Sequence, residues 1–127
     1  MTDVGLFRIS VGVENARRQT DVILVPDTLV DTGSEATWIP RVVLESLEIA
    51  VEKKRTFIFA DGRRIERDIG YAIVHAAGTN TIDEVVFGEE TDFPILGAHS
   101  LEGLNLRVDP VQKILVDAGP ILAVAAA

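Results

Sequence analysis

The chain has 127 residues, of which 47% are hydrophobic and 25% charged, a balance typical of one folded domain with its own core. It contains no cysteine, which excludes disulfides, thiolate metal ligands and thiol nucleophiles. The formal net charge of -8 disfavours nucleic acid as a partner, because phosphate binding depends on clustered Lys and Arg side chains.

The N-terminus lacks the features of a secretory signal. Met1-Thr2-Asp3 places an acid where a basic segment would be needed, and no apolar run approaches the length of a membrane span. We therefore expect a cytoplasmic protein without a membrane partner.

Two strands are expected in the first thirty residues. Apolar and polar residues alternate over residues 6–13, which is the period of a half-buried strand. Residues 14–17 predict a polar turn and residues 20–25 a second strand. Pro26 should end that strand, because proline cannot donate to a ladder, and a short run over residues 28–31 follows.

A short helix is expected after the next extended segment. Residues 35–39 favour extended chain, and Pro40 suits the first turn of a helix, where its missing N–H is harmless. Val43, Leu44 and Leu47 then fall on one helical face. The pattern predicts a helix that ends near Leu47.

Asp61-Gly62 is the strongest hairpin signal in the chain. It lies between a predicted strand over residues 56–59 and a long one over residues 64–75. One face of the long strand should carry Ile69, Tyr71, Ile73 and His75.

Turn signals remain frequent up to the second apolar run of the chain. A turn is predicted at residues 78–80, a strand at residues 81–87 and a polar loop at residues 88–92. The apolar run over residues 93–97 is closed by a glycine.

The C-terminal third predicts one more helix and two core strands. The helix covers residues 100–104, and the strands cover residues 106–109 and 113–116 around a turn at Pro110. The tail over residues 119–127 is apolar, so it is either a frayed end or a strand that packs on a partner subunit. Many short strands with two short helices predict one all-β, barrel-like domain over residues 1–127.

The stretch over residues 29–34 carries the clearest chemical signal. Two apolar residues bring a buried strand to its end, where Asp31 follows. An ionised carboxylate in such a place is costly unless hydrogen bonds or a second acid that shares its proton relieve it. Asp31 is therefore a catalytic candidate, and the alternative is an acid that caps an ordinary turn.

Three motifs in order resemble the retropepsins, the single-domain homodimeric aspartic proteases of retroviruses and their cellular and bacterial relatives. The resemblance covers about residues 22–116. The motifs are Asp31-Thr32-Gly33-Ser34, then Ala60-Asp61-Gly62-Arg63 at a hairpin tip, then Ile95-Leu96-Gly97 before a helix.

The resemblance implies a closed acid-protease β-barrel in which Asp31 is the catalytic acid. In the active-site loop, Thr32 would hydrogen-bond the two subunits' loops together and Gly33 would offer its backbone to substrate, with Ser34 beside them. The hairpin tip Ala60, Asp61, Gly62 and Arg63 would be a flap that closes over the peptide. The substrate pocket would contain Trp38, Ile95, Leu96 and Gly97.

The chain departs from the viral pattern at two places. Its flap carries Asp61, Arg63 and Arg64 where viral flaps are rich in glycine. Ala98 stands where viral members have an arginine that ties the dimer together. Both departures bear on flap mobility and on how the dimer is held.

Several other residues have a simple structural interpretation. Asp109 suits a turn former, and the two histidines, His75 and His99, suit packing or surface positions because no acid or cysteine stands at ligand spacing. Ser34 lacks the Gly-x-Ser-x-Gly signature of a serine nucleophile, and Trp38 fits core or subsite equally. No metal site and no cofactor follow from the sequence.

Peptide hydrolysis by carboxylates needs one acid as base toward water and another as proton donor. The chain has one Asp-Thr-Gly, so the second carboxylate should be Asp31 of an identical subunit. The expected function is a homodimeric aspartic endopeptidase acting on an extended peptide or protein below neutral pH. The alternatives are a weakly active or inactive dimeric peptide-binding module using the same cleft, and a protease that needs a further partner.

Overall fold

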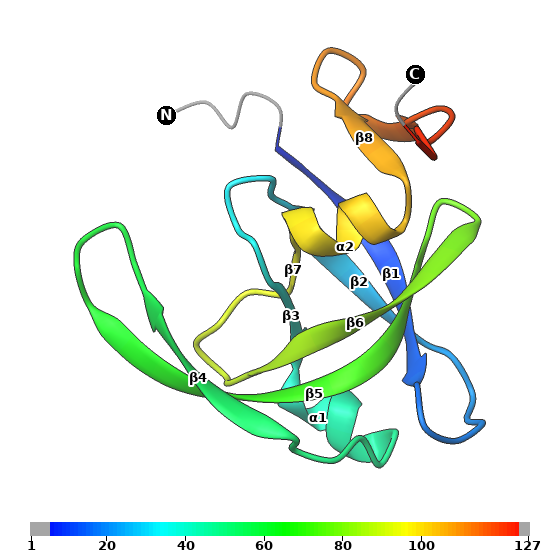
Figure 1. The fold of residues 1–127 in the computed structure, drawn as a ribbon. Coiled ribbons are helices and arrows are strands. Elements are labelled where there is room, and N and C mark those ends of the chain that lie inside the picture. Colours follow the sequence, from blue (N-terminus) through cyan, green and yellow to red (C-terminus); the bar gives the residue numbers. More distant parts are fainter. Residues whose placement is uncertain (1–5, 125–127) are drawn as a thin grey trace.

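The computed structural model describes residues 6–124 and consists mainly of strands (Figure 1). Both helices in this part of the chain have six residues, so neither is long enough to cross a membrane. The prediction of an all-β fold is confirmed. The elements are β1 (Phe7–Asn15), β2 (Ile23–Val30), β3 (Thr37–Pro40), α1 (Arg41–Ser46), β4 (Lys53–Ile58), β5 (Arg64–Ala76), β6 (Thr79–Gly88), β7 (Ile95–Leu96), α2 (Ala98–Gly103), β8 (Leu106–Asp109) and β9 (Ile114–Asp117).

Seven of the strands form one sheet that closes on itself. Their order is β1-β2-β7-β3-β6-β5-β4, and β1 also pairs with β5, so six strands make a ring. β4 is the end strand, and the β4–β5 hairpin extends beyond the ring as an arm (Figure 1). β8 and β9 form a separate two-stranded sheet.

The main core lies inside the ring and depends on small residues in β5. Ala72 and Val74 are fully buried there, whereas Tyr71 and Ile73 of the other face are only half-buried. Gly70 permits close packing, because a Cβ at this position would lie 2.8 Å from Ile49 Cγ2. Period-two alternation therefore places one face of β5 in the core, as a strand requires.

The prediction that Pro26 ends the second strand is wrong. β2 continues through Pro26 and Asp27, because both residues lie opposite Ser10 of β1 where the register shifts. Asp27 has φ 53°, and a bulge of this kind accommodates a proline that cannot donate to the ladder. The chain thereby reaches Asp31 in one uninterrupted strand.

Two predicted turns begin at other residues in the structure. Glu14 and Asn15 belong to β1, and the buried Asn15 side chain donates to the carbonyl oxygens of Leu47 and Glu48. The turn predicted at residues 78–80 lies one residue earlier, at Ala77 and Gly78, both of which have positive φ. The first difference results from contacts between Asn15 and residues far away in sequence.

The two predicted helices and the last hairpin are present. α1 follows Pro40 and buries Leu44, and α2 begins two residues earlier than the predicted range of residues 100–104. Asp109 is confirmed as a turn former, since its carboxylate accepts the N–H groups of Val111 and Gln112.

The tail beyond β9 pairs with no strand of this chain as far as residue 124. Ile121, Leu122 and Val124 are strongly exposed there. The start of the tail is fixed, since Asn105 Nδ2 donates to the Gly119 carbonyl. Residues 125–127 of the predicted tail, like residues 1–5 of the predicted domain, lie outside the described residues.

Candidate functional site

Asp31 lies where β2 ends, beside the segment that contains β7. β2 and β7 are parallel, with Leu29 opposite Ile95 and Val30 opposite Leu96. The Asp31 N–H continues this pairing by donating to the Leu96 carbonyl at 3.1 Å. Two motifs that are far apart in sequence, the Asp31 turn and Ile95-Leu96-Gly97, therefore lie side by side.

The turn after Asp31 closes on the carboxylate itself. The Gly33 N–H donates to Asp31 Oδ1 at 2.8 Å, and the Ser34 N–H donates to the Asp31 carbonyl at 3.2 Å. The Ser34 hydroxyl donates to the Ala36 carbonyl, so its proton is already in use. The Asp31 side chain is half-buried, and one carboxylate oxygen is fixed by the backbone while the residue still faces a cleft.

The first two residues of α2 hydrogen-bond the rest of this loop. The Ala98 N–H donates to the Ser34 carbonyl at 2.7 Å, and the His99 N–H donates to the Glu35 carbonyl at 3.1 Å. A Cβ on Gly97 would lie 2.3 Å from the Ala36 carbonyl oxygen, so only glycine allows this approach. Residues 31–37 contain the catalytic candidate Asp31, and we call them the catalytic turn.

A cleft of about 1070 Å³ opens between the catalytic turn and the β4–β5 arm. Ala60 and Arg63 of the hairpin tip line it, together with residues of β6, α2 and the loop before β7. The predicted site residues that line this cleft are Asp31, Gly33, Ser34, Trp38, Ala60, Arg63 and Ile95.

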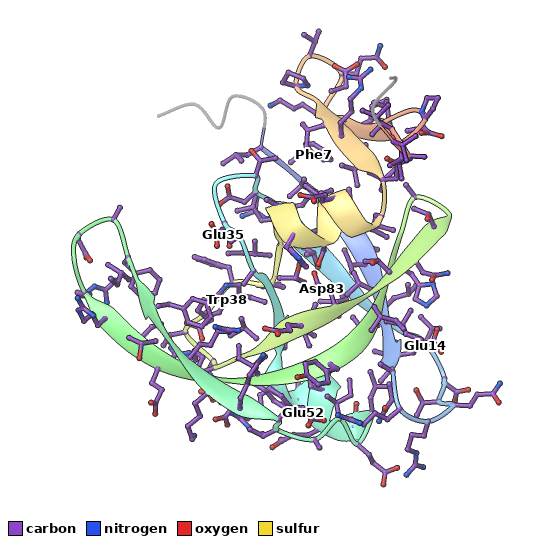
Figure 2. The ribbon with its side chains drawn as sticks, viewed as in Figure 1. Phe7, Glu14, Glu35, Trp38, Glu52 and Asp83 are labelled. Atoms are coloured by element: carbon purple, nitrogen blue, oxygen red, sulfur yellow. The ribbon has the colours of Figure 1, made fainter. Side chains whose placement is uncertain are left out.

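An apolar cluster separate from the main core forms the floor of the cleft. Its buried members are Trp38, Ile69 and Val86, with Phe57 of the arm packed against them. The Trp38 and Phe57 ring centroids are 5.0 Å apart, and Figure 2 shows Trp38 in the space between β3 and the arm. Trp38 is only 7% exposed, so it is both a packing residue and part of the cleft wall.

The hairpin tip is closed by short-range contacts. The Phe59 N–H donates to the Arg63 carbonyl, and Gly62 adopts φ 88°. The Asp61 carboxylate accepts the backbone N–H and Nε–H of Arg63, which lowers the pKa of Asp61. The Arg63 guanidinium also lies over the Phe59 ring, 4.8 Å from its centroid. The charged residues of the tip therefore pair with each other.

Five predicted site residues do not line the main cleft. Asp61 and Gly62 are at the exposed outer end of the tip, Leu96 is fully buried in the main core, and Gly97 is buried against the catalytic turn. Thr32 instead lines a smaller, mostly apolar pocket of about 350 Å³, whose other residues are Ala98, Leu101, Glu102, Asn105, Leu106, Arg107, Val108 and Ala118.

The sequence interpretation gave no role to Asp83, which the structure places at the cleft. Asp83 is 8% exposed and accepts hydrogen bonds from His99 Nδ1 at 2.8 Å, Ser100 Oγ at 2.7 Å and the Glu84 N–H at 2.7 Å. Figure 2 shows it between α2 and β6. The available signal was its position in β6, because Val85 and Phe87 two and four residues later point into the core.

Both histidines bind carboxylates. His75 Nε2 lies 2.6 Å from Glu14 Oε1, between β5 and β1 and away from the cleft lining. The largely exposed His99 lines the cleft, and its hydrogen bond to Asp83 raises the pKa of His99.

The group of Asp83, His99 and Ser100 is not a nucleophilic triad. Ser100 is fully buried, and its hydroxyl donates a hydrogen bond to Asp83 rather than to His99, so it has neither access to substrate nor the histidine base of a triad. Within residues 6–124, no three His, Asp or Glu side chains are arranged to hold a metal ion. The chemistry that this site supports best is therefore acid–base chemistry at Asp31.

Comparison of this sequence with protein-family models and with curated proteins found no match.

Proposed function

We propose that this chain is an aspartic endopeptidase of the retropepsin type that works as a homodimer. The observation that carries the proposal is the Asp31 carboxylate, which accepts the Gly33 N–H in a tight turn and faces a large cleft that a β-hairpin arm also lines. Such a constellation suits cleavage of an extended chain, with a general acid or base on one side and a hairpin on the other.

Three of the other four acids that line the cleft are already bound to other groups, which supports a second subunit as the source of the second carboxylate. Asp83 accepts three donors, and Arg67 binds Asp92 through two hydrogen bonds. Lys53 binds Glu84, which lowers the pKa of Glu84. Acids that are bound in this way are poor proton donors, which supports Asp31 of a second copy, rather than one of these three, as the partner of Asp31.

Two Asp31 carboxylates that face each other across a two-fold axis cannot both ionise, and they share one proton. The ionised one takes a proton from water, which attacks the scissile carbonyl carbon. The protonated one hydrogen-bonds the carbonyl oxygen and later supplies the proton that the leaving amine requires. Activity then peaks below neutral pH, where the shared proton is retained.

The cleft walls favour an extended peptide with apolar side chains. The backbone of the arm lies along one side, where main-chain hydrogen bonds can bind a strand. Trp38 and Phe57 fill the floor, which restricts the depth available to a substrate side chain. We expect small or medium aliphatic residues to be preferred over large aromatic ones next to the cleaved bond.

The apolar pocket beside Thr32 supports the dimer. Leu101, Leu106 and Val108 line it, and the exposed side chains of Ile121 and Leu122 follow β9 on the same chain. A second copy that buries this apolar surface would stabilise the dimer. Apolar contact would then take the place of the arginine that viral members have at the position of Ala98.

The experiment is a peptide-library digest at acidic and neutral pH with wild type, Asp31→Asn, Glu35→Gln and Asp21→Asn. Glu35→Gln tests whether the exposed carboxylate that also lines the cleft supplies the second acid, and Asp21→Asn is the matched control at an exposed aspartate outside the cleft lining. The proposal requires cleavage that Asp31→Asn abolishes and that both Glu35→Gln and Asp21→Asn retain. Peptide binding without cleavage by wild type would replace it with a binding module in the same cleft.

A further inference from the structure

A buried chain of hydrogen bonds connects Asp83 with the backbone at the catalytic turn. Ser100 Oγ donates to Asp83 Oδ2 at 2.7 Å, Thr37 Oγ1 lies 2.6 Å from Ser100 Oγ, and the Gly97 N–H donates to Thr37 Oγ1 at 3.0 Å. We call these four residues the Asp83 chain. They come from β6, α2, β3 and the residue before α2.

The direction of every bond in the Asp83 chain follows from its acidic end. An ionised carboxylate only accepts, so the single Ser100 proton points at Asp83. Ser100 must then accept from Thr37, whose own oxygen accepts the Gly97 N–H. The charge of Asp83 therefore orients each hydroxyl as far as the backbone.

The Asp83 chain is buried, so water cannot replace a hydrogen-bond partner that is lost. Thr37 and Ser100 are fully buried, and Asp83 is nearly so. The remaining acceptor capacity of Asp83 is used by His99 Nδ1 and by the Glu84 N–H. An unsatisfied group in such surroundings costs about 1–3 kcal/mol, so the network is either complete or strained.

The far end of the Asp83 chain meets the groups that hold Asp31. Gly97 follows Leu96, whose carbonyl accepts the Asp31 N–H, and precedes the two α2 residues that donate to Ser34 and Glu35. Thr37 is the last residue of the catalytic turn. One carboxylate on β6 is thus connected to both flanks of that turn through the buried side chains of Ser100 and Thr37.

We propose that Asp83 is a positioning residue for the catalytic turn. Its ionised carboxylate sets the direction of the Asp83 chain and so keeps Gly97 and residues 31–37 in the geometry that presents Asp31. The catalytic part of this inference rests on the proposed function, whereas the tether itself does not.

Asp83→Asn tests the direction of the chain with little change of shape. The amide nitrogen would donate to Ser100, which would turn its proton toward Thr37, and the Thr37 hydroxyl would lose its acceptor. We expect kcat on apolar peptides to fall on the order of 10- to 100-fold with a nearly unchanged KM, because small displacements of catalytic groups have effects of this size. The Gly97 amide should exchange its hydrogen faster.

A second pair of variants keeps the test valid if Asp83→Asn does not fold. Thr37→Val removes the hydroxyl at nearly constant volume, and Thr37→Ser restores it. The serine variant should recover most of the kcat and of the Gly97 protection that the valine variant loses. Asn15→Ala is the control for destabilisation alone, because Asn15 is buried in the ring away from the cleft lining and should leave kcat unchanged.

The two proposals fail separately. If wild type cleaves no peptide, the peptidase proposal is wrong, and Gly97 exchange still decides the tether: faster exchange in Asp83→Asn supports it and unchanged exchange overturns it. If wild type cleaves and a folded Asp83→Asn retains wild-type kcat, or if Thr37→Ser is as impaired as Thr37→Val, the positioning role of Asp83 is overturned.

Discussion

Asn15 and Asp83 are both polar side chains buried in the same ring of strands, yet they differ in what they hold. Asn15 is neutral, is 6% exposed, and donates to two backbone carbonyls at the end of α1. Asp83 is charged, is 8% exposed, and accepts from three groups beside the catalytic turn. The neutral group joins two elements, whereas the charged one also determines the direction of other hydrogen bonds. This difference predicts that a substitution of Asn15 mainly lowers the free energy of unfolding. A substitution of Asp83 should instead mainly displace the catalytic turn.

The largest expected effect is that of Asp31→Asn, in the turn that the Asp83 chain contacts. We expect cleavage to disappear while the free energy of unfolding stays close to wild type, because the change keeps the shape and the hydrogen bond from Gly33. Peptide cleavage assays and urea unfolding measure the two quantities. Residual cleavage near the wild-type rate would remove Asp31 from the mechanism.

The next largest effect concerns the floor of the cleft. Trp38→Leu removes the aromatic contact with Phe57 and should lower the free energy of unfolding by about 2–4 kcal/mol, while it deepens the floor. The folded variant should accept larger side chains next to the cleaved bond, as a peptide library would show. An unchanged preference would mean that Trp38 only packs.

Asn15→Ala should cost about 1–3 kcal/mol of unfolding free energy, because two backbone acceptors lose their donor in a buried site. Its kcat per folded molecule should equal that of wild type. A marked fall in the kcat of fully folded Asn15→Ala would contradict the difference in role between Asn15 and Asp83.

The smallest effect is the pH dependence that His99 adds. Asp83 raises the pKa of His99, so the protonated pair stabilises the folded state fully below the unfolded value of 6.5. This stabilisation is lost as pH rises through the higher folded pKa, and solvent screening keeps it small because His99 is largely exposed. Urea unfolding of wild type and His99→Gln across this range should converge at high pH. A difference that grows with pH would contradict the assignment.

The strands and the Asp31 motif could be predicted from sequence because their signals are local. Alternation over residues 6–13 and the Asp61-Gly62 turn predicted real elements, and the repeated turn signals predicted an all-β fold. The passage of β2 through Pro26 could not be predicted, because it depends on a bulge opposite Ser10. The roles of Asp83 and Asn15 were missed for a related reason, since His99, Ser100 and the Leu47 carbonyl, which they bind, lie 16 or more residues away.

The central claim is that catalysis needs Asp31 from two copies of the chain. A fixed amount of wild type, mixed with increasing amounts of Asp31→Asn and allowed to exchange subunits, tests it most directly. We predict that cleavage falls steadily toward zero as wild-type subunits are drawn into mixed dimers that have one carboxylate. Cleavage that stays constant whatever the excess of Asp31→Asn would show that one chain is sufficient, and would contradict the account.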